Sequence, residues 1–472
     1  MNTLQRFFII SAVALLSLLG LSACIEDGIS TSAADQPSFS TDTVRLGTLF
    51  TLDASPTSRF IVYNRHDKGI NISSIAFADD PSGIFRINVD GMAGRRFDNV
   101  EIRANDSIFV FVECTLPENG APLPVKMLAH IEFLTNGVTS RLPVSATGRD
   151  VTRLRGDVRF SGAATLQAGK PYQIFDSLVV EQGATLTVAP GAELFFCDDA
   201  RIAVHGTLRV EGTPEKPVTM AGYRTGFVAA DIPYEIMSGQ WRGIEFAPTS
   251  SANRISHASI RNSAAGLRLD RLSAADPQGP PALTLVNSQV RNTQNYVIEA
   301  IHSSITAAGC ELTDASSGIV RLVGGSHSFN HCTFANYYLF TALGGPAVQF
   351  EHIDADSAEP DAGESLPYLS ADFANCIIYG NGTELSHGEL DGLPVTLRRC
   401  LLRSAGTDDD NFLDCLWDTD PLYFTDRQAY IFDYRLQPGS PAASAADPAL
   451  TSPLTASDFF GTPRPADTPA LG

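Results

Sequence analysis

One short phrase recurs six times in the second half of this chain and constrains its fold more than any other feature. Each copy has a polar or small pair, then a small residue or cysteine, one variable residue, and an aliphatic residue or phenylalanine. The small residues stand at positions 258, 288, 310, 332, 376 and 400, so the steps are 30, 22, 22, 44 and 24 residues. Most steps are close to one or two multiples of 22, which indicates a solenoid. The copies span Ser256–Asn262, Asn287–Asn292, Gly309–Asp314, His331–Asn336, Asn375–Gly380 and Arg399–Ser404.

The alternation within each phrase indicates which kind of solenoid to expect. Cys-x-Leu or Cys-x-Phe is a strand pattern of period two, and no helical stripe follows it, as a leucine-rich repeat would require. The sequence therefore predicts an all-β chain with a parallel β-helix, in which each turn stacks on the next at roughly 4.8 Å.

Four cysteines occupy the small-residue position of the phrase: Cys310, Cys332, Cys376 and Cys400. In a β-helix they share one slot in successive turns, which predicts a structural ladder of buried thiols. Disulfides or a metal site are the alternative, because adjacent rungs lie within disulfide Cα range. Seven cysteines follow Cys24, an odd number, so at least one is unpaired in a monomer, which favours the ladder.

The amino terminus predicts export. Residues 1–23 read as a lipoprotein signal peptide, with one positive charge at Arg6 and an apolar run from Phe7. The segment Leu21–Cys24 resembles a bacterial lipobox, which implies cleavage before Cys24 and lipid attachment there. An ordinary secretory signal is the alternative. Residues 24–37 are then expected to form a lipidated tether.

The net charge and an acidic pair after Cys24 indicate where the protein is located and how it is attached to the membrane. Glu26 and Asp27 resemble the tag of Bacteroidetes lipoproteins on the outer face of the outer membrane, so we expect an outer-membrane protein, with the cell surface favoured over the periplasmic face. The net charge of −20 argues against nucleic acid and against an electrostatically held membrane surface. The membrane partner would therefore be reached through the lipid anchor.

Residues 38–150 predict a β-sandwich. Short alternating segments at Phe60–Asn64, Ile70–Ile75, Phe85–Val89, Ser107–Val112 and Ala129–Phe133 are separated by turn residues. These segments, with the final Val144–Gly148, resemble immunoglobulin-like modules. The resemblance implies a fold and leaves the function open, a spacer or partner-docking role being the simplest.

Residues 151–472 resemble the right-handed parallel β-helix proteins of the pectin-lyase-like superfold, especially those carried by Bacteroidetes lipoproteins. Ala184–Phe196 and Ile202–Thr213 alternate, with glycine at the corners. Residues 416–472, here called the closing segment, resemble the last part of that group through Asp420–Phe424 and Asp458–Arg464. The expected final Asp-Ile-Gly-Ala is replaced by Pro469–Gly472, which predicts a different cap.

Enzymes of the superfold set the test for catalysis. Its lyases use a carboxylate-held Ca²⁺ with a Lys or Arg base, and hydrolases use two or three Asp in one cleft. Neither signature occurs in the sequence, so the catalytic residues are unknown. The paired carboxylates Asp198-Asp199 and Asp408–Asp410 stand where turns are expected.

An acidic insertion near residues 345–370 is the other candidate. Glu351–Glu364 holds six carboxylates and a histidine. Glu351, His352, Asp354 and Asp356 could form a cation or glycan cluster, with Ca²⁺ as the possible cofactor. A solvated loop and a catalytic site are the alternatives.

The sequence therefore predicts a non-catalytic cell-envelope lipoprotein whose β-helix face binds a polysaccharide or a surface protein. A divergent Ca²⁺-dependent polysaccharide lyase is one alternative, and a structural spacer or adhesin is another.

Overall fold

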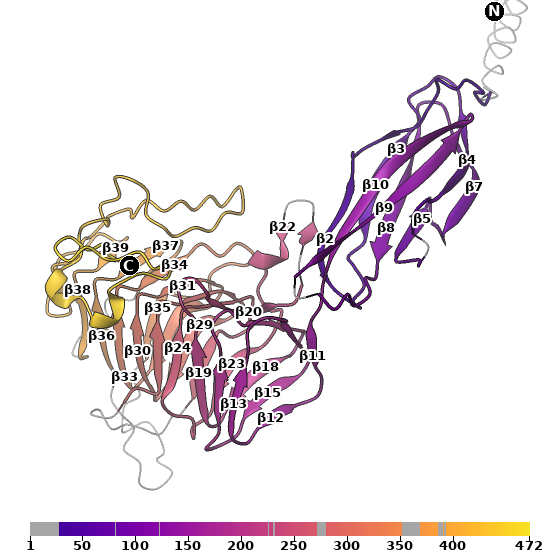
Figure 1. The fold of residues 1–472 in the computed structure, drawn as a ribbon. Helices are drawn as coiled ribbons and strands as arrows, with labels where there is room; N and C mark the ends of the chain where they lie inside the picture. The colour runs from indigo at the N-terminus through magenta and orange to yellow at the C-terminus, as the bar shows by residue number, and fades with distance from the viewer. Residues whose placement is uncertain are drawn as a thin grey trace, which may run out of the picture. The chain divides into compact units, whose positions relative to one another are not determined.

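The computed structural model describes residues 28–472 apart from 81, 122, 225, 230–231, 271–279, 352–368, 386–389 and 391–392. The chain forms two compact units, Met1–Asp150 and Val151–Gly472, each described by itself. Both are built from β-strands (Figure 1).

The first unit consists of two five-stranded sheets that enclose one core. Alternate side chains enter this core, as in β5, where Phe85, Ile87 and Val89 are buried and Arg86 is exposed. One sheet contains, in spatial order, β1 (Ser38–Phe39), β3 (Ser58–Tyr63), β8 (Ser107–Cys114), β5 (Phe85–Val89) and β6 (Met92–Gly94). The other contains β2 (Val44–Phe50), β10 (Val138–Arg149), β9 (Val125–Thr135), β4 (Ile70–Phe77) and β7 (Arg96–Ile102). The five strand segments expected from sequence overlap β3, β4, β5, β8 and β9, while the immunoglobulin-like assignment stays a prediction.

The described part of the expected tether, residues 28–37, is bonded to the sandwich. Ile29 forms a parallel bridge with Gly69, and the backbone nitrogen of Ser30 donates to the Gly69 carbonyl at 2.7 Å. Ser30 is buried, and the Gln36 side chain donates to the Thr135 carbonyl at 3.0 Å. These bonds fix the segment on the sandwich, because its backbone finds partners there.

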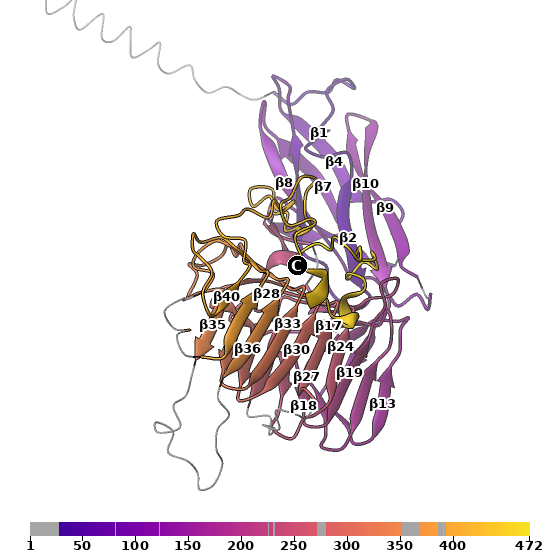
Figure 2. The same cartoon turned by 90° about the vertical axis from the view of Figure 1, so that its left-hand side faces the viewer.

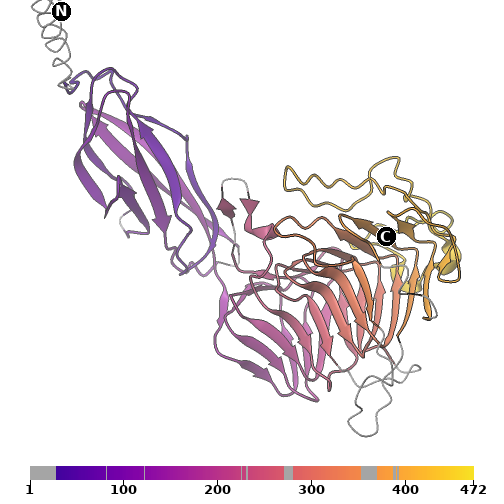
Figure 3. The same ribbon diagram turned by 180° about the vertical axis from the view of Figure 1, so that it is seen from behind.

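The second unit is a parallel β-helix of three sheets, in which most rungs contribute one strand to each sheet in turn (Figures 1 and 3). The first sheet contains β11 (Thr152–Leu154), β14 (Tyr172–Ile174), β17 (Glu193–Phe196), β20 (Val218–Gly222), β25 (Ala258–Arg261), β28 (Gln289–Thr293), β31 (Glu311–Ala315), β34 (Thr333–Asn336), β37 (Ile377–Gly380) and β39 (Leu401–Leu402). The second contains β12 (Val158–Phe160), β15 (Ser177–Val180), β18 (Arg201–Val204), β23 (Gly243–Phe246), β26 (Leu267–Asp270), β29 (Tyr296–Ile301), β32 (Gly318–Val323) and β35 (Val348–Glu351).

The third sheet faces the viewer in Figure 2, with its strands side by side. It contains β13 (Ala163–Leu166), β16 (Thr185–Val188), β19 (Thr207–Glu211), β24 (Asn253–Ser256), β27 (Leu283–Val286), β30 (Ser304–Ala308), β33 (Ser326–Asn330), β36 (Ser370–Ala374), β38 (Val395–Arg398) and β40 (Phe412–Leu413). Outside the three sheets lie β21 (Phe227–Ala229), β22 (Ile232–Pro233) and the short 3₁₀ helices η1 (Tyr234–Ile236), η3 (Pro448–Leu450) and η4 (Pro453–Thr455).

The recurring phrase forms the corner that leads into the first sheet. In every copy the residue before the aligned small residue has a positive φ, between 42° and 65°. This left-handed conformation turns the chain from the third sheet into the first, and short polar residues and glycine tolerate it best. These corner residues are His257, Asn287, Gly309, His331, Asn375 and Arg399.

Apolar stacks fill the interior of the solenoid. Phe329 and Phe373 stack with ring centroids 4.8 Å apart, and Phe334 meets Phe373 edge to face. Trp241 stacks on Phe196 at 4.1 Å and donates its indole N–H to the Arg261 carbonyl at 2.8 Å. Aromatic pairs in such geometries add to the burial that holds successive rungs together.

The closing segment folds back over the outer face of the first sheet. Its Tyr423, Tyr434 and Leu471 pack on Ile377 and Leu401, in a second apolar cluster outside the solenoid core. Apart from η3 and η4 it contains only isolated bridges in regular structure. The solenoid therefore carries a cover on this part of the first sheet.

Candidate binding face

The outer face of the first sheet presents its side chains in rows, because parallel strands stack in register. One row contains Ser259, Gln289, Glu311, Thr333 and Ile377. The next row, two residues further along each strand, contains Arg261, Arg291, Thr313, Ala335 and Tyr379. The middle of the face is thus polar and charged, while its far end is apolar and covered by the closing segment.

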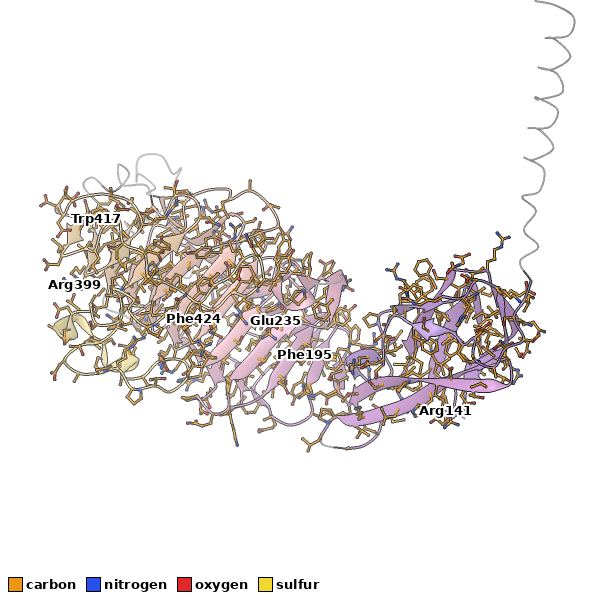
Figure 4. All side chains as sticks on the ribbon, turned by 90° about the horizontal axis from the view of Figure 1, so that it is seen from above. Arg141, Phe195, Glu235, Arg399, Trp417 and Phe424 are labelled. Carbon is orange, nitrogen blue, oxygen red and sulfur yellow. The ribbon has the colours of Figure 1, made fainter. Side chains whose placement is uncertain are left out.

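Two asparagines hold the loop around η1 over this face. The Asn262 amide donates to the carbonyls of Glu235 at 2.6 Å and Met237 at 2.8 Å. The Asn292 amide also donates to the Glu235 carbonyl, at 3.2 Å. Asn262 directly follows β25, and Asn292 is the last residue but one of β28. Both have a positive φ and follow the paired residues Arg261 and Arg291, so the repeat places them at the same position of neighbouring rungs. In Figure 4, Glu235 lies between Phe195 and Phe424.

Glu235 is the ion-pair partner of two neighbouring guanidinium groups. Its Oε1 lies 3.7 Å from Arg261 Nε and 3.5 Å from an Nη of Arg291. Both arginine side chains are 20% exposed, whereas that of Glu235 is 57% exposed. The Nε of each arginine is buried and has no hydrogen-bond partner among the described residues. Burial also lowers the pKa of Arg261 below its usual range, so this charge is held at a cost.

Two carboxyl groups lie on β31 beside these arginines. Burial raises the pKa of Glu311 to about 7, against the opposing effects of Arg291 and of Gln289, whose amide donates to Glu311 at 3.0 Å. The second oxygen of Glu311 is buried and unpartnered within the described part of the chain. Burial raises the pKa of Asp314 to about 6, although Tyr434 donates its hydroxyl to that carboxylate at 2.6 Å. Perturbed carboxyls of this kind mark candidate functional sites.

Corner residues of the solenoid hold the closing segment. His331 Nδ1 lies 2.9 Å from the Ala470 carbonyl oxygen, and its Nε2 lies 3.0 Å from Thr451 Oγ1. Asn375 donates to the Asp447 carbonyl and accepts from the Asp447 nitrogen, at 2.9 and 2.8 Å. Arg399 donates to the Ala445 carbonyl at 2.6 Å. Side chains that the corner conformation turns outward thus serve as the attachment points.

A cavity of about 320 Å³ lies between the first sheet and the closing segment. Glu311, Gln289 and Thr333 line it from the sheet, while Tyr434, Arg435, Asp458, Phe459, Phe460 and Arg464 line it from the closing segment. Its wall therefore combines guanidinium, carboxyl, amide and aromatic groups. Small-molecule sites commonly have this composition, with an apolar wall and a few polar groups placed to fix orientation.

The thiols of Cys310, Cys332, Cys376 and Cys400 are buried inside the solenoid beneath the first sheet, and none is in a disulfide. Each donates to the carbonyl two residues before it, at 3.3 to 3.6 Å. Burial raises the pKa values of Cys310 and Cys376 well above the usual range of a thiol.

Sequence reasoning missed a fifth member of this ladder, Cys415. Leu416 pairs with Leu401 as the next rung, and the Cys415 thiol donates to the Leu397 carbonyl at 3.3 Å. Asp414-Cys415-Leu416-Trp417 resembles the phrase, with Trp417 at the position of the aliphatic residue or phenylalanine, and Asp414 has the positive φ of a corner.

Of the acidic insertion, Glu351 alone among the four candidates is described; His352, Asp354 and Asp356 lie outside the described residues. The two carboxylate oxygens of Glu351 each accept from Arg321, at 2.7 Å. Within the part of the chain that the structure describes, no group of three or more His, Cys, Asp or Glu side chains is placed to hold a metal ion.

The paired carboxylates expected at turns form turns. Asp198 has a positive φ and lies 3.6 Å from Arg224, and Asp409 accepts from two backbone nitrogens that follow it. The residues that the sequence reading did not select are Glu235, Arg261, Arg291, Glu311 and Arg464. Arg261, Arg291 and Glu311 belong to the quoted phrases, where the residues on either side of the aliphatic position point outward together.

No protein-family model and no curated protein sequence matches this chain. Among solved structures, the catalytic unit of a thermostable family 87 α-1,3-glucanase from Streptomyces thermodiastaticus is similar at 12% identity and a TM-score of 0.19, over 74% of this chain and 80% of that one. A family 123 glycoside hydrolase from Clostridium perfringens matches at 11% identity and a TM-score of 0.19, over 25% of this chain and 26% of that one. A protein of unknown function from Porphyromonas gingivalis matches at 14% identity and a TM-score of 0.18, over 27% of this chain and 59% of that one. Similarity of this degree says nothing about the activity of this protein. Any argument about function therefore rests on the residues of the face.

Proposed function

We propose that this protein is a non-catalytic cell-envelope lipoprotein that binds a glycan along the outer face of the first sheet. The observation that carries the proposal is a set of buried polar atoms on this face that have no hydrogen-bond partner among the described residues: the Nε atoms of Arg261 and Arg291 and one oxygen of Glu311. Buried polar groups are normally hydrogen-bonded, so a set of such atoms on one face indicates a ligand that supplies the partners.

The arrangement of the face suits an extended, hydroxyl-rich chain. Within each row, side chains follow one another at the rung spacing. The two rows present different hydrogen-bond donors and acceptors. Phe424 and Phe460 are 47% and 55% exposed at the closing segment, where a sugar ring could stack. A surface protein as the partner would need a larger apolar contact, since cores of such interfaces are depleted in charge.

Lipid attachment at Cys24 and an outer-membrane location, with the cell surface favoured, belong to the same proposal and rest on the lipobox and the acidic pair after it. Among the described residues, no helix is long and apolar enough to cross a bilayer. Metabolic labelling with a fatty acid should label the wild type and fail to label a Cys24→Ala variant. Equal labelling of both would contradict the anchor.

The test of binding uses the chain from residue 25 on, which contains every residue that the structure describes. It is incubated with acidic and neutral polysaccharides, with and without Ca²⁺, and followed by affinity electrophoresis, ultraviolet absorbance and released reducing ends. We expect retardation in the gel without product. An unsaturated product that disappears on chelation would establish a Ca²⁺-dependent lyase instead, and silence in all three assays would leave a structural spacer.

Arg291→Gln tests whether the face is the binding surface. It should weaken retardation, because Arg291 lies in the middle of the face and is mostly buried. The matched control is Arg201→Gln on the second sheet, whose side chain is similarly placed in an ion pair with Glu245 at 3.0 Å. Equal retardation of both variants would place the binding surface elsewhere.

A further inference from the structure

We propose that the cavity between the first sheet and the closing segment holds the uncharged terminal sugar residue of the bound glycan, so that the protein binds the end of a chain and not its middle. This inference rests on the proposed function and deepens it by naming the part of the glycan that the face selects. The walls of the cavity, its size, its unpartnered polar atoms and the pairing of its charges support the assignment.

The closing segment borders the cavity on three sides. At one edge of the sheet, Tyr434 is bonded to the carboxylate near the end of β31, at 2.6 Å. At the other edge, the Phe459 ring stacks on that of His257, with centroids 6.5 Å apart, at the corner before β25. At the far end, Gly472 donates its backbone nitrogen to the Asn375 carbonyl at 3.0 Å, at the corner before β37. The cavity is therefore bounded along both edges and at its β37 end.

The fourth side continues the face. The row that contains Gln289 and Glu311 runs on, away from the closing segment, through Ser259 on β25 and Thr219 on β20. An extended glycan can approach along this row. It cannot continue past β34, because the next residue of the row, Ile377, is buried under the closing segment. A chain that enters the cavity must therefore end there.

The cavity has room for one sugar ring. Its volume of about 320 Å³ is at the small end of the range for ligand sites, about 300–1,000 Å³. Phe459 and Phe460 line it, with ring centroids 5.2 Å apart in an edge-to-face pair. Asp458 closes the turn that holds them, because its Oδ1 accepts from the backbone nitrogen of Phe460 at 2.9 Å. Phe460 is 55% exposed, so its ring offers an apolar surface to the C–H groups of a sugar.

Two buried polar atoms in the lining of the cavity have no hydrogen-bond partner among the described residues. One is an oxygen of Glu311, and the other is the Nε of Arg464. A carboxylate oxygen accepts a hydrogen bond and a guanidinium nitrogen donates one. Hydroxyl groups do both, so the hydroxyls of one sugar residue can supply partners to both atoms. An anionic group could only accept, and an ammonium group could only donate.

The charged groups of the cavity are paired with one another. Arg435 binds Asp433 through two nitrogens of its guanidinium. Arg464 donates from an Nη atom to an oxygen of the terminal carboxylate of Gly472, at 2.8 Å. Asp458 adds a further negative charge to the lining. A charged substituent would meet a like charge beside each opposite one and would lose its hydration, so the cavity favours an uncharged residue.

The experiment separates binding of chain ends from binding of chain interiors. Affinity electrophoresis of the chain from residue 25 on uses four uncharged polysaccharides: a linear galactan, an arabinan, a mannan and a β-1,3-glucan. The one that retards the protein is then used as a soluble competitor, intact and after partial hydrolysis to fragments that are shorter but still longer than the face. If hydrolysis raises the number of ends about tenfold, the mass concentration for half competition should fall about tenfold.

The same fragments identify which end is bound. Borohydride opens the sugar ring at the reducing end and leaves the other end intact. Loss of competition after this treatment assigns the cavity to the reducing end, and unchanged competition assigns it to the non-reducing end.

Phe460→Ala tests whether the end is bound in this cavity. The variant loses the exposed ring and should need about tenfold more of the fragments for half competition. The matched control is Phe109→Ala on β8 of the sandwich, whose ring is 42% exposed, and it should behave as the wild type does. Unchanged competition in Phe460→Ala would overturn the assignment to this cavity.

Two results would overturn the inference while the proposed glycan binding stands. One is half competition at the same mass concentration before and after hydrolysis, because the protein would then bind chain interiors. The other is retardation by acidic polysaccharides alone. Absence of retardation by every polysaccharide, neutral or acidic, would overturn both the inference and the proposed function.

Discussion

The outer faces of the first and second solenoid sheets contain similar charged residues in opposite arrangements. On the second sheet, Glu245, Arg268, Glu299 and Arg321 follow one another in a single row, so each charge is next to its opposite. Arg268 lies 3.2 Å and Arg321 lies 2.7 Å from Glu299. On the first sheet, Arg261 and Arg291 are direct neighbours in their row, with Glu235 from a separate loop between them.

On the second sheet the charged side chains find their partners within the face, whereas on the first sheet they do not all do so. Opposite charges across neighbouring strands stabilise a sheet, and like charges in the same position destabilise it. The alternating row of the second sheet therefore needs no ligand. The paired arginines of the first sheet each keep a buried Nε that has no hydrogen-bond partner among the described residues. We infer that the first face carries the function and the second is structural.

The largest expected effect concerns how the first face is covered. Tyr434→Ala removes a buried ring and both hydrogen bonds to Asp314, and should lower the free energy of unfolding by about 3–5 kcal/mol. Tyr296→Ala on the second sheet, where the ring is partly exposed and its hydroxyl donates to Gln349 at 3.2 Å, is the matched control and should cost much less. Urea unfolding followed by circular dichroism measures both. Similar losses would mean that the closing segment adds no special stability.

The second effect is on binding. Arg291→Gln should weaken affinity for the bound polysaccharide by about tenfold or more, because a hydrogen bond to a charged group contributes about 1.5–3 kcal/mol. Arg321→Gln on the second face should leave that affinity unchanged. Calorimetry at pH 6 provides the comparison, and a loss shared by the two variants would contradict the assignment of the faces.

The third effect is the pH dependence of stability. The pKa values of Glu311 and Asp314 in the folded chain, about 7 and about 6, are raised above those of exposed carboxyls. Groups of this kind contribute stability that is present below their unfolded pKa, near 4, and is lost as pH rises through the folded values. The urea concentration at the midpoint of unfolding should therefore decrease as the pH is raised from 4.5 to 7.5. In Glu311→Gln that fall should be smaller, and an unchanged slope would show that Glu311 is more hydrated than its position indicates.

The smallest effect is expected on the second face. Glu299→Gln breaks partly exposed ion pairs with Arg268 and Arg321, and should change the free energy of unfolding by about 1 kcal/mol or less, with the change shrinking at high salt. Urea midpoints at low and high ionic strength test this. A loss of several kcal/mol would show that the charged row holds the solenoid together and would weaken the contrast between the faces.

The sequence predicted the solenoid well because its signal is local and repeated. Each phrase contains its own corner residue, inward small residue and inward aliphatic, so six copies agree on one geometry. The step of 44 residues between Cys332 and Cys376 corresponds to one step between paired strands, β34 and β37, with the extra residues between them.

The candidate site was largely missed, because its members come from distant segments. Glu235 meets Arg291 across 56 positions, and Tyr434 meets Asp314 across 120. No local pattern links them. The insertion that drew attention by its composition contributes, in its described part, an ordinary ion pair of Glu351 with Arg321. A cluster of carboxylates can be found in the sequence alone, whereas a buried side chain without a hydrogen-bond partner can be found only in the folded structure.

The attachment of the closing segment has a consequence for the order in which the molecule assembles. Rungs of the solenoid pair with neighbours about 22 residues away, whereas His331 meets Ala470 across 139 residues. Contacts of long sequence separation form slowly, so we expect the rungs to stack first and the closing segment to dock last. Pulsed hydrogen exchange during refolding would show this as late protection of residues 416–472. Until that step, Ile377 and Leu401 are exposed to solvent. Chaperones and proteases can therefore bind this apolar surface during folding, but not in the folded protein.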